Sequence, residues 1–516
     1  LFRSQSIYAQ TPEYTPWKND EIQETWNPAE YKSLFWLSGT VNGLAWWCSS
    51  DANWIINPNK ANIIAKRNAV STVINIEFFA SPATLKSKAE YTMVFQATPP
   101  GRPDYSLREV AHGQHWFPAA DSVNVAGHSG SKTIADDNIL NWISLIPVDQ
   151  DKFRAHMQKL AAEGRKTRLY AMPTHLSSLD AEYDMFFKTW AIQPAITWQA
   201  NRPGSGEEYV VEPCCANTPL GNIHAYRIDK LYQDNPELSG LYFDIMHCRN
   251  CSNTLHGCGG TDAFGKAYST SIALNLREYT LRILKIHRKH GRCFGIHAHS
   301  AYFPFVHDLG DYWMPGEELF SPIEANPRWG YLEVVSPEAH QSAWNPEVRG
   351  IFIRTMAQHE RIARILRFDG AKKAAFRSDD YALNHLSSCI LYDLAASSFG
   401  SEKQDHVLFK YWKIIKDVKL NQAQFHGYWI DPIASGSPQM KASWYSWNGN
   451  APYSRLICLV NTGRETAATA LEIDWKALGI DRPEALYELW SGKTFTEKDL
   501  AAFQLDGHKF MLLGIR

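Results

Sequence analysis

The sequence predicts an α/β fold: a (β/α)8 TIM-type barrel flanked by an N-terminal β-sandwich and a small C-terminal antiparallel β-sandwich. Strand-like runs occupy both ends of the chain, and helical and strand patterns alternate between them. The length of 516 residues, 45% of them hydrophobic, suits a barrel with appended domains better than one core. We expect the domains to cover residues 1–105, 106–435 and 436–516. A doubly wound sheet is the competing topology for the middle segment.

The N-terminal segment has the composition of strands. Ser71–Phe79 and Tyr91–Thr98 are rich in β-branched and aromatic residues. Thr98–Pro103 then reads TPPGRP, whose prolines and glycine continue neither a strand nor a helix. The sequence therefore predicts a β-sandwich that ends near this point.

The middle segment alternates helices with short apolar strands. Predicted helices at Asp151–Gly164, Asn222–Gln233 and Ser271–Gly291 are followed by strands at Thr167–Pro173, Ser239–Ile245 and Cys293–His299. Gly291 is the expected stop of the third helix. Further helices are predicted at Pro346–Leu366, Ala382–Ser398 and His406–Val418.

The C-terminal segment returns to alternating strands separated by hairpin-like turns. This pattern predicts a small antiparallel sandwich. The expected strands are Ser454–Asn461, Thr466–Ile473, Ala485–Trp490 and His508–Ile515.

Composition narrows the range of partners. The net charge is −2, and lysines and arginines are spread along the chain, which argues against nucleic acid as a partner. No apolar run is long enough to cross a bilayer. The chain opens LFRSQSIYAQ without Met, as a processed or truncated start does. We expect a periplasmic or extracellular location, and the sequence does not give the oligomeric state.

Carboxylates and imidazoles are concentrated where the predicted barrel strands end. The active site of such a barrel lies at the carboxyl ends of its strands, and cleavage of a glycosidic bond needs two carboxyl groups. Asp244 suits the nucleophile or stabiliser and Glu317 the general acid/base, with Asp308 and Asp311 as substitutes for Glu317. The residues predicted to bind substrate are His175, Glu212, His247, His297, His299, Trp198, Trp313 and Trp344.

Structural alternatives exist for each of these assignments. Asp244 could cap the next helix or pair with a buried arginine, and Glu317 could be an acid at a helix start. His297 and His299 share one strand face, where they could bind substrate hydroxyls or a metal, or lie satisfied in the core. The chain has 19 tryptophans, which suit stacking on sugars but also the cores of β-rich domains.

Cysteines cluster in the loop that follows Asp244. Cys248, Cys251 and Cys258, with His247 and His256, could supply the three cysteines and one histidine of a zinc site, although a second CxxC pair is absent. A disulfide that braces the loop in an exported protein and reduced, packed thiols are the other interpretations. The adjacent Cys214 and Cys215 are too strained to be assumed bonded to each other. We predict neither a cofactor nor a bound metal.

Four stretches carry a family resemblance: Leu34–Trp54, Gly240–Gly260 (GLYFDIMHCRNCSNTLHGCGG), Ile296–Glu318 and Leu456–Trp475. They are similar to bacterial glycoside-hydrolase-like proteins related to glycoside hydrolase family 123, the β-N-acetylgalactosaminidase family. The resemblance implies an N-terminal β-sandwich, a catalytic barrel and a C-terminal β-sandwich.

The sequence departs from that family at one position. The family is expected to use a neighbouring Asp-Glu pair for substrate-assisted catalysis, whereas Ile245 follows Asp244 here. We therefore expect a retaining glycosidase with carboxyl groups about 5 Å apart, rather than the roughly 6.5–9.5 Å of an inverting enzyme. The alternatives are a substrate-assisted β-N-acetylhexosaminidase, a non-catalytic carbohydrate-binding protein and a metal-dependent enzyme.

Overall fold

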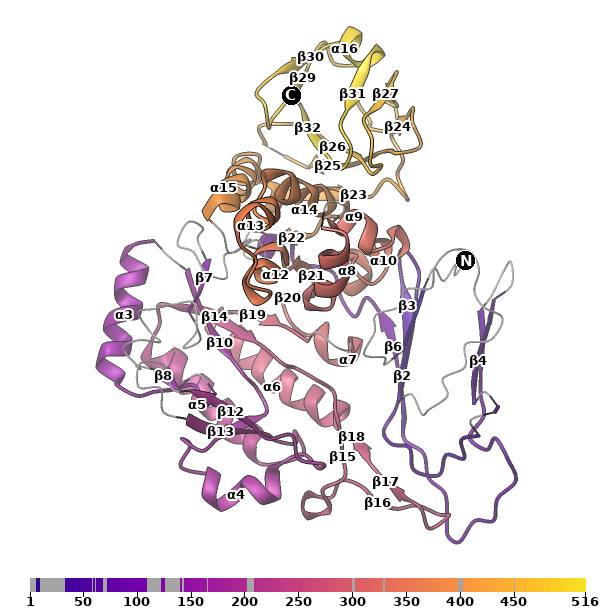
Figure 1. The fold of residues 1–516 in the computed structure, drawn as a ribbon, viewed down its shortest axis with the longest axis vertical. Helices are drawn as coiled ribbons and strands as arrows, with labels where there is room; N and C mark the ends of the chain where they lie inside the picture. Colours follow the sequence, from indigo (N-terminus) through magenta and orange to yellow (C-terminus); the bar gives the residue numbers. More distant parts are fainter. Residues whose placement is uncertain are drawn as a thin grey trace. The chain divides into compact units, whose positions relative to one another are not determined.

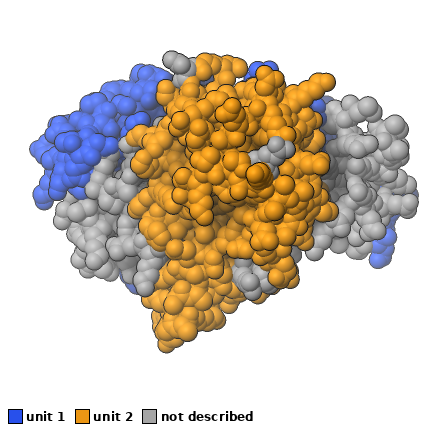
Figure 2. Space-filling model, turned by 90° about the horizontal axis from the view of Figure 1, so that it is seen from above, with its two compact units in different colours: residues 1–102, 121–313, 347–351 blue, residues 103–120, 314–346, 352–516 orange. Residues whose placement is uncertain are grey.

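The computed structural model, whose helices and strands are drawn in Figure 1, divides into two compact units. Residues 1–102, 121–313 and 347–351 form unit 1, and residues 103–120, 314–346 and 352–516 form unit 2; Figure 2 colours them separately. The structure describes residues 6–9, 33–57, 59–60, 62–67, 72–108, 122–125, 140–141, 143–164, 166–201, 208–298, 302–327, 330–397, 402–449 and 451–516. Within these ranges, no helix has the length and apolar composition needed to cross a bilayer.

The N-terminal part of unit 1 contains an antiparallel sheet in the order β1-β2-β3-β6. The side chains of Phe35, Trp46 and Trp54 pack beneath it, together with Ile74 of a β4–β5 hairpin. Two layers therefore share one core, and the strands predicted near residues 71–79 and 91–98 are confirmed. The bounds are β1 (Ser6–Ala9), β2 (Leu34–Ser38), β3 (Gly43–Cys48), β4 (Ile63–Arg67), β5 (Thr72–Ile76) and β6 (Met93–Thr98).

A parallel sheet in the order β20-β19-β14-β10-β7 lies at the centre of unit 1. Strands that follow one another along the chain are neighbours, as in a barrel sheet. The strands are β7 (Ser122–Val125), β10 (Lys166–Ala171), β14 (Leu238–Phe243), β19 (Cys293–Ile296) and β20 (Tyr312–Trp313). The helices between them along the chain are α3 (Gln150–Ala162), α4 (Tyr183–Trp190), α5 (Leu220–Asp234), α6 (Ala273–His290) and α7 (Pro304–His307).

Unit 2 contains the parallel pair β21 (Phe352–Thr355) with β22 (Ala395–Ala396). The barrel prediction is thus confirmed in part, because the described residues form a partial barrel-type sheet and a closed ring of eight strands is not seen among them. The other main helices of unit 2 are α8 (Phe320–Ala325), α9 (Gly330–Val334), α10 (Pro337–Gln341), α12 (His359–Ile365), α13 (Gly370–Phe376), α14 (Asp379–Tyr392) and α15 (Glu402–Asp417).

Apolar side chains on one face of the unit 1 sheet pack against its helices. The ring of Phe243 lies 5.0 Å from that of Phe294 and 6.4 Å from that of Tyr279 on α6. His287 of α6 also packs on Phe294 and accepts a hydrogen bond from Tyr232 of α5 at 2.9 Å. This covered face leaves the opposite face of β14 for other side chains.

Three predicted elements differ from the structure. The helix predicted at Ala382–Ser398 ends at Tyr392 in α14, and the strand β22 follows it. The predicted helix at Pro346–Leu366 is instead α11 (Pro346–Arg349), β21 and α12, because Gly350 turns the chain with φ 74° before a β-branched run. The segment carrying Glu212 was expected to end at the barrel mouth. It forms β13 (Glu208–Pro213), which pairs antiparallel with β11 (His175–Ser177) and β12 (Trp198–Asn201) in a sheet of its own.

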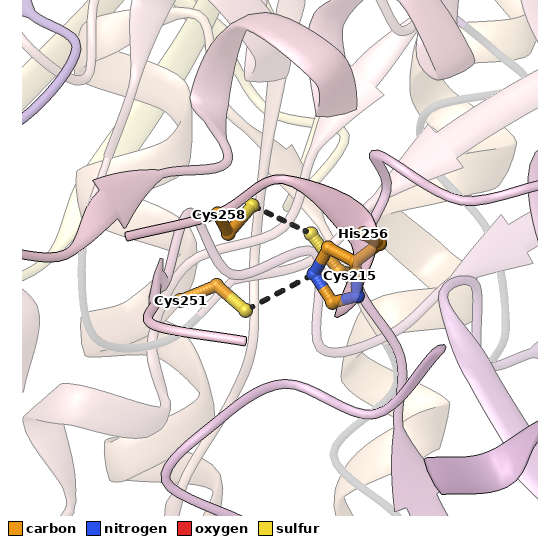
Figure 3. Close-up of side chains that lie close together, drawn as sticks. All are labelled: Cys215, Cys251, His256 and Cys258. Carbon is orange, nitrogen blue, oxygen red and sulfur yellow. Dashed lines mark hydrogen bonds between the residues drawn. The ribbon is translucent and has the colours of Figure 1, made fainter. Parts of the chain in front are cut away.

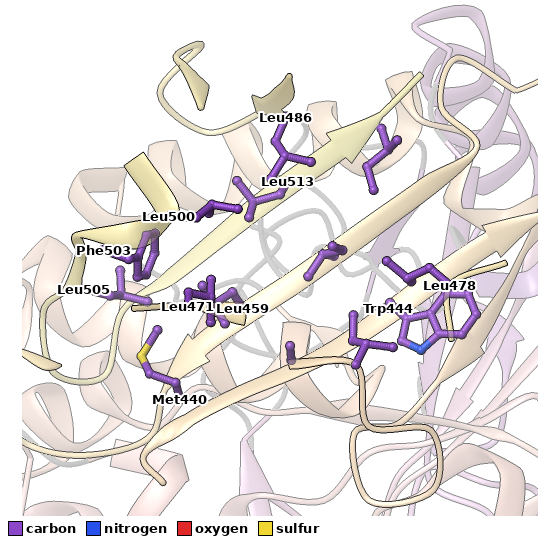
Figure 4. Packing of buried hydrophobic residues seen from close by; sticks show 14 of the residues in the cluster. Met440, Trp444, Leu459, Leu471, Leu478, Leu486, Leu500, Phe503, Leu505 and Leu513 are labelled. Atoms are coloured by element: carbon purple, nitrogen blue, oxygen red, sulfur yellow. The ribbon is translucent and has the colours of Figure 1, made fainter. Parts of the chain in front are cut away.

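The C-terminal part of unit 2 is a six-stranded sheet in the order β23-β25-β26-β32-β29-β30. Met440, Trp444 and Leu459 of this sheet pack against Leu471, Phe503 and Leu505 (Figure 4). The predicted antiparallel sandwich-like region is confirmed. Its strands are β23 (Ala423–His426), β24 (Ala434–Ser435), β25 (Met440–Trp447), β26 (Arg455–Asn461), β27 (Ala467–Thr469), β28 (Glu472–Ile473), β29 (Leu486–Glu488), β30 (Thr494–Phe495), β31 (Phe503–Leu505) and β32 (Phe510–Ile515).

Candidate active site

Strand register brings a row of polar and aromatic residues onto one face of the unit 1 sheet. Tyr170 is level with Tyr242, Tyr242 with Gly295, and Gly295 with Tyr312. Side chains two residues apart share a face of a strand. Asp244 and His297 therefore belong to the same face as this row, at the carboxyl ends of β14 and β19.

Asp244 is the central carboxylate of this face. The Tyr170 hydroxyl donates a hydrogen bond to its Oδ2, and the backbone N–H of Ile245 donates to its Oδ1 at 2.8 Å. His297 Nε2 lies 3.7 Å from Oδ1. The Asp244 side chain is 18% exposed, so it is partly buried but accessible.

The chain is strained immediately after this carboxylate. Ile245 has φ 54°, a left-handed conformation that a β-branched residue rarely adopts. The backbone is held there, because Asp244 N–H donates to Ala171 O at 2.9 Å and Met246 N–H donates to His297 O at 3.0 Å. Strain held in place by its surroundings is common at functional sites.

His307 fixes the same loop through its backbone. Its Nε2 donates to Met246 O at 2.8 Å, while its Nδ1 accepts from Phe303 N–H at 2.9 Å. Burial lowers the pKa of His307 to about 3, so the ring is neutral near pH 7 and has the tautomer that these two bonds require.

The other predicted substrate-binding residues lie near these loops with different partners. His175 Nδ1 donates to Pro173 O at 2.7 Å, and burial lowers the pKa of His175 to about 4. Its Nε2 has no hydrogen-bond partner within the described part of the chain. Glu212 Oε1 accepts from the Thr197 hydroxyl at 2.7 Å. His247 is half-buried and its Nδ1 lies 3.5 Å from an Arg249 nitrogen, while His299 lies outside the described residues.

Asp308 and Asp311 are both held in ion pairs. Arg349 Nε donates to Asp308 at 2.7 Å, the Tyr302 hydroxyl also donates to Asp308, and both charged side chains are fully buried. Burial raises the pKa of Asp308 to about 6 against the opposing effect of Arg349. Asp311 binds Arg288 at 2.6 Å and precedes β20, so it lies at the opposite strand end from Asp244.

Glu317 begins a single 3-10 turn, Glu317–Leu319, in unit 2. Its Oε1 lies 2.8 Å from Arg361 Nη2, and the Glu317 side chain is 26% exposed. Asp244 belongs to unit 1, so the predicted separation of the two carboxyl groups stays a prediction.

The predicted stacking tryptophans lie in packed surroundings. Trp313 and Trp344 are each 1% exposed, so neither ring offers a free face, and the Arg349 guanidinium lies 4.5 Å from the Trp313 ring centre. Trp198, on β12, packs partly buried against Met172 and Val211.

Sequence patterns missed two participants. The sequence indicates Tyr170 only as a residue of an apolar strand. Arg168 lies two residues earlier and so on the same face of the strand, and this polar neighbour could have indicated a functional face. Cys215 was considered only beside Cys214, yet its Sγ lies 3.7 Å from that of Cys258, in a cluster with Cys251 and His256 (Figure 3). All nine cysteines are free thiols in the structure.

Known proteins offer distant structural likenesses. A noncanonic maltogenic α-amylase AmyB from Thermotoga neapolitana has 10% identity and TM-score 0.46, covering 81% of this chain and 96% of its own. An α-amylase from Geobacillus thermoleovorans has 7% identity and TM-score 0.44, covering 77% and 89%. A family 36 α-galactosidase AgaA from Geobacillus stearothermophilus has 9% identity and TM-score 0.43, covering 99% and 72%. No curated protein matches the chain.

One family model matches the sequence. It is the model described as "Glycoside hydrolase 123, C-terminal domain", and it covers residues 409–504, from within α15 to β31. The relation to family 123 that the sequence motifs predict is confirmed over this C-terminal region.

Proposed function

We propose that this protein is a glycoside hydrolase that cleaves an O-glycosidic bond in a glycan or oligosaccharide, with Asp244 as nucleophile and Glu317 as general acid/base. The observation that carries the proposal is the position of Asp244, a partly buried carboxylate at the carboxyl end of β14 with Tyr170 and His297 beside it. Barrel enzymes hold their catalytic groups at this end of the strands. The family 123 match supports a glycoside hydrolase in general.

The contacts of Asp244 suit a group that meets a developing positive charge. Each carboxylate oxygen accepts one hydrogen bond, from Tyr170 and from Ile245 N–H, and these bonds fix the orientation of the side chain. A retaining reaction needs such a fixed carboxylate to form a bond with the anomeric carbon. Ile245 supplies no neighbouring carboxylate, which weighs against substrate-assisted catalysis.

Glu317 is the better choice for the acid/base than Asp308. Glu317 is partly exposed and its partner Arg361 is 30% exposed, so a substrate oxygen has access to the pair. Asp308 is enclosed by Arg349 and Tyr302, and removing it leaves a buried cation. Although its pKa of about 6 suits an acid, we assign Asp308 to the architecture of the site.

The proposed substrate is a carbohydrate and the proposed location is the periplasm or the extracellular space. His175 stays a predicted substrate-binding residue, although its Nε2 is buried in this structure. The proposed chemistry uses two carboxyl groups and calls for no cofactor.

Hydrolysis of a broad panel of aryl glycosides and natural glycans tests the proposal. Wild type is compared with Asp244→Asn, Glu317→Gln and Asp308→Asn, and NMR follows the anomer of the first product. The matched control is Asp184→Asn, which alters an exposed aspartate on α4 (Tyr183–Trp190). We expect turnover in wild type and control, and a loss of about 1,000-fold or more in Asp244→Asn with sugar binding retained.

The outcomes separate the alternatives. A first product with the substrate's anomeric configuration supports retention, and the opposite anomer supports inversion with Asp244 as base. Loss of turnover in Asp308→Asn with normal stability would transfer the acid/base role from Glu317. No turnover across the panel, with equal sugar binding by wild type and Asp244→Asn, would replace the enzyme with a carbohydrate-binding protein.

A further inference from the structure

Four metal-ligating side chains from two distant parts of unit 1 converge beside the loop that follows Asp244. Cys215 follows β13, Cys251 ends β15 (Asn250–Cys251), His256 ends the 3-10 turn Thr254–His256, and Cys258 follows it. Their sulfur atoms and one imidazole nitrogen all lie within 4.8 Å of one another. In Figure 3 the four side chains point toward a common centre.

The spacing of these atoms resembles the edges of a tetrahedral zinc site. Zn–S and Zn–N bonds of about 2.3 Å and 2.0–2.1 Å give tetrahedral edges of about 3.8 Å between two sulfurs and about 3.5 Å between sulfur and nitrogen. Cys215 Sγ and Cys258 Sγ are 3.7 Å apart, and Cys251 Sγ and His256 Nε2 are 3.3 Å apart. The remaining separations are at most 4.8 Å, so shifts of about 1 Å or less would bring all four atoms to the corners of a tetrahedron.

Hydrogen bonds around the cluster hold the ligands as a metal requires. His256 Nδ1 donates to Thr189 O at 2.7 Å, and this bond orients the ring so that Nε2 faces the sulfurs. The N–H groups of Asn217 and Asn253 donate to Cys215 Sγ and Cys251 Sγ at 3.4 and 3.5 Å. Backbone donors of this kind stabilise thiolates.

The surroundings exclude water from the three sulfurs. Cys215 and Cys251 are 0% exposed and Cys258 is 1% exposed, and all three belong to a cluster with Ile192 and Ile272.

We propose that Cys215, Cys251, His256 and Cys258 bind one Zn²⁺ in a closed structural site. Binding releases the thiol protons to solvent, and four protein ligands leave no position open for a substrate or catalytic water. The site joins the end of β13 to the loop after β14, so a bound metal would hold in place the loop that follows Asp244. This inference stands independently of the proposed hydrolase activity.

The same atoms admit one competing chemistry, a Cys215–Cys258 disulfide formed by a thiol oxidant. Such a bond requires the two sulfurs to approach to about 2.05 Å. It would use only two of the four groups and would leave His256 Nε2 and Cys251 without a function. The ligand set therefore favours the metal.

Metal analysis of the full chain, purified without chelator under reducing conditions, tests the site. We expect about one zinc per chain by mass spectrometry of metals, and release of that zinc on titration with a mercurial reagent. After exchange with Co²⁺ alone, the intense visible absorption of tetrahedral cobalt–thiolate should appear. Neither readout depends on enzymatic activity.

Variants make the assignment specific to these residues. Cys251→Ser and His256→Ala should lower the zinc content to about one tenth or less, whereas His256→Cys should retain it with four thiolate ligands. The matched control is Cys248→Ser, which alters a buried cysteine of the same loop outside the cluster and should keep about one zinc. Wild type without zinc and without the cobalt spectrum, or with a Cys215–Cys258 disulfide found by peptide mass mapping, would overturn the proposal.

Discussion

The hydroxyl of Tyr170 reaches Asp244 from the neighbouring strand and donates a hydrogen bond to its Oδ2. A hydrogen bond to a charged group contributes about 1.5–3 kcal/mol. Under the proposed retaining mechanism, this bond would orient Asp244 in the ground state and help the carboxylate leave when the intermediate breaks down. Tyr170 would then be a positioning residue, whose removal should alter rate more than binding.

We expect Tyr170→Phe to lower kcat by about 10- to 100-fold with a smaller change in KM, because the ring stays and only the donor to Asp244 is lost. Steady-state kinetics across pH on the best substrate of the panel measures this, since a purely structural role would not move the pH profile. Tyr226→Phe, at an exposed tyrosine on α5, is the control and should match wild type. An unchanged kcat in Tyr170→Phe would contradict the role.

At the scale of elements, β14 depends on a glycine for its approach to β19. A Cβ built at Gly240 would lie 2.1 Å from the backbone oxygen of Cys293, and backbone cannot move aside as a flexible side chain can. The two strands pair at these positions, so any shift would disturb the register that carries Asp244.

Gly240→Ala should therefore destabilise unit 1 by about 1–3 kcal/mol or more, as overpacking does in a tight interior. Urea unfolding followed by tryptophan fluorescence measures the change. Gly101→Ala is the matched control, because nothing lies within 4 Å of its added Cβ. Equal free energies of unfolding for the two variants would contradict this prediction. They would show that β14 and β19 can move apart at Gly240 without loss of stability.

Elements with a strong local pattern were predictable, and those defined by distant partners were not. The helix ending at Gly291 was expected from its apolar period and its glycine stop, and α6 ends there with φ 62° at Gly291. By contrast, β13 and a barrel strand look alike as short apolar runs. Only pairing with β11 and β12 decides between them, and a single sequence does not encode that choice locally.

At the scale of the whole molecule, buried neutral histidines occur in both units. Burial lowers the pKa of each to about 3 or 4, compared with about 6.5 in an unfolded chain. They are His175, His224, His287, His307, His340, His359 and His385.

Stability should therefore fall as the protein is acidified. Each group's contribution is present above its unfolded pKa of about 6.5 and is lost as the pH falls toward the folded value, because only the unfolded chain takes up the proton. We expect the free energy of unfolding to decrease between about pH 6.5 and pH 4 by about 1.4 kcal/mol per pH unit for each histidine. Urea titrations at several pH values measure the slope.

His224→Leu tests the assignment, since the His224 ring on α5 makes one long hydrogen bond, with Tyr279 at 3.4 Å. In this variant, the slope of the free energy of unfolding against pH should be smaller than in wild type by about 1.4 kcal/mol per pH unit, which corresponds to one proton. A free energy of unfolding that does not change over this pH range would contradict the prediction. It would mean that the histidines take up protons in the folded protein as readily as in the unfolded chain.

The sequence predicts the candidate sites only in part. Asp244 was predictable because a charged residue at the end of a buried run stands out. The cysteine cluster could be predicted only in part. Cys251, His256 and Cys258 are close in sequence, whereas Cys215 follows a different strand. The partner that completes a site is set by the fold, and spacing along one chain does not reveal it.

The contact between Gly295 and Tyr312 has a consequence for how this sequence can diverge. A Cβ at Gly295 would lie 2.1 Å from the Tyr312 ring, so the two positions share a single volume across neighbouring strands. Position 295 therefore cannot gain a methyl group while Tyr312 keeps its ring, whereas a smaller residue at 312 meets no such barrier. Descendants of this chain that keep the tyrosine should keep the glycine, and a change at 312 should precede any change at 295.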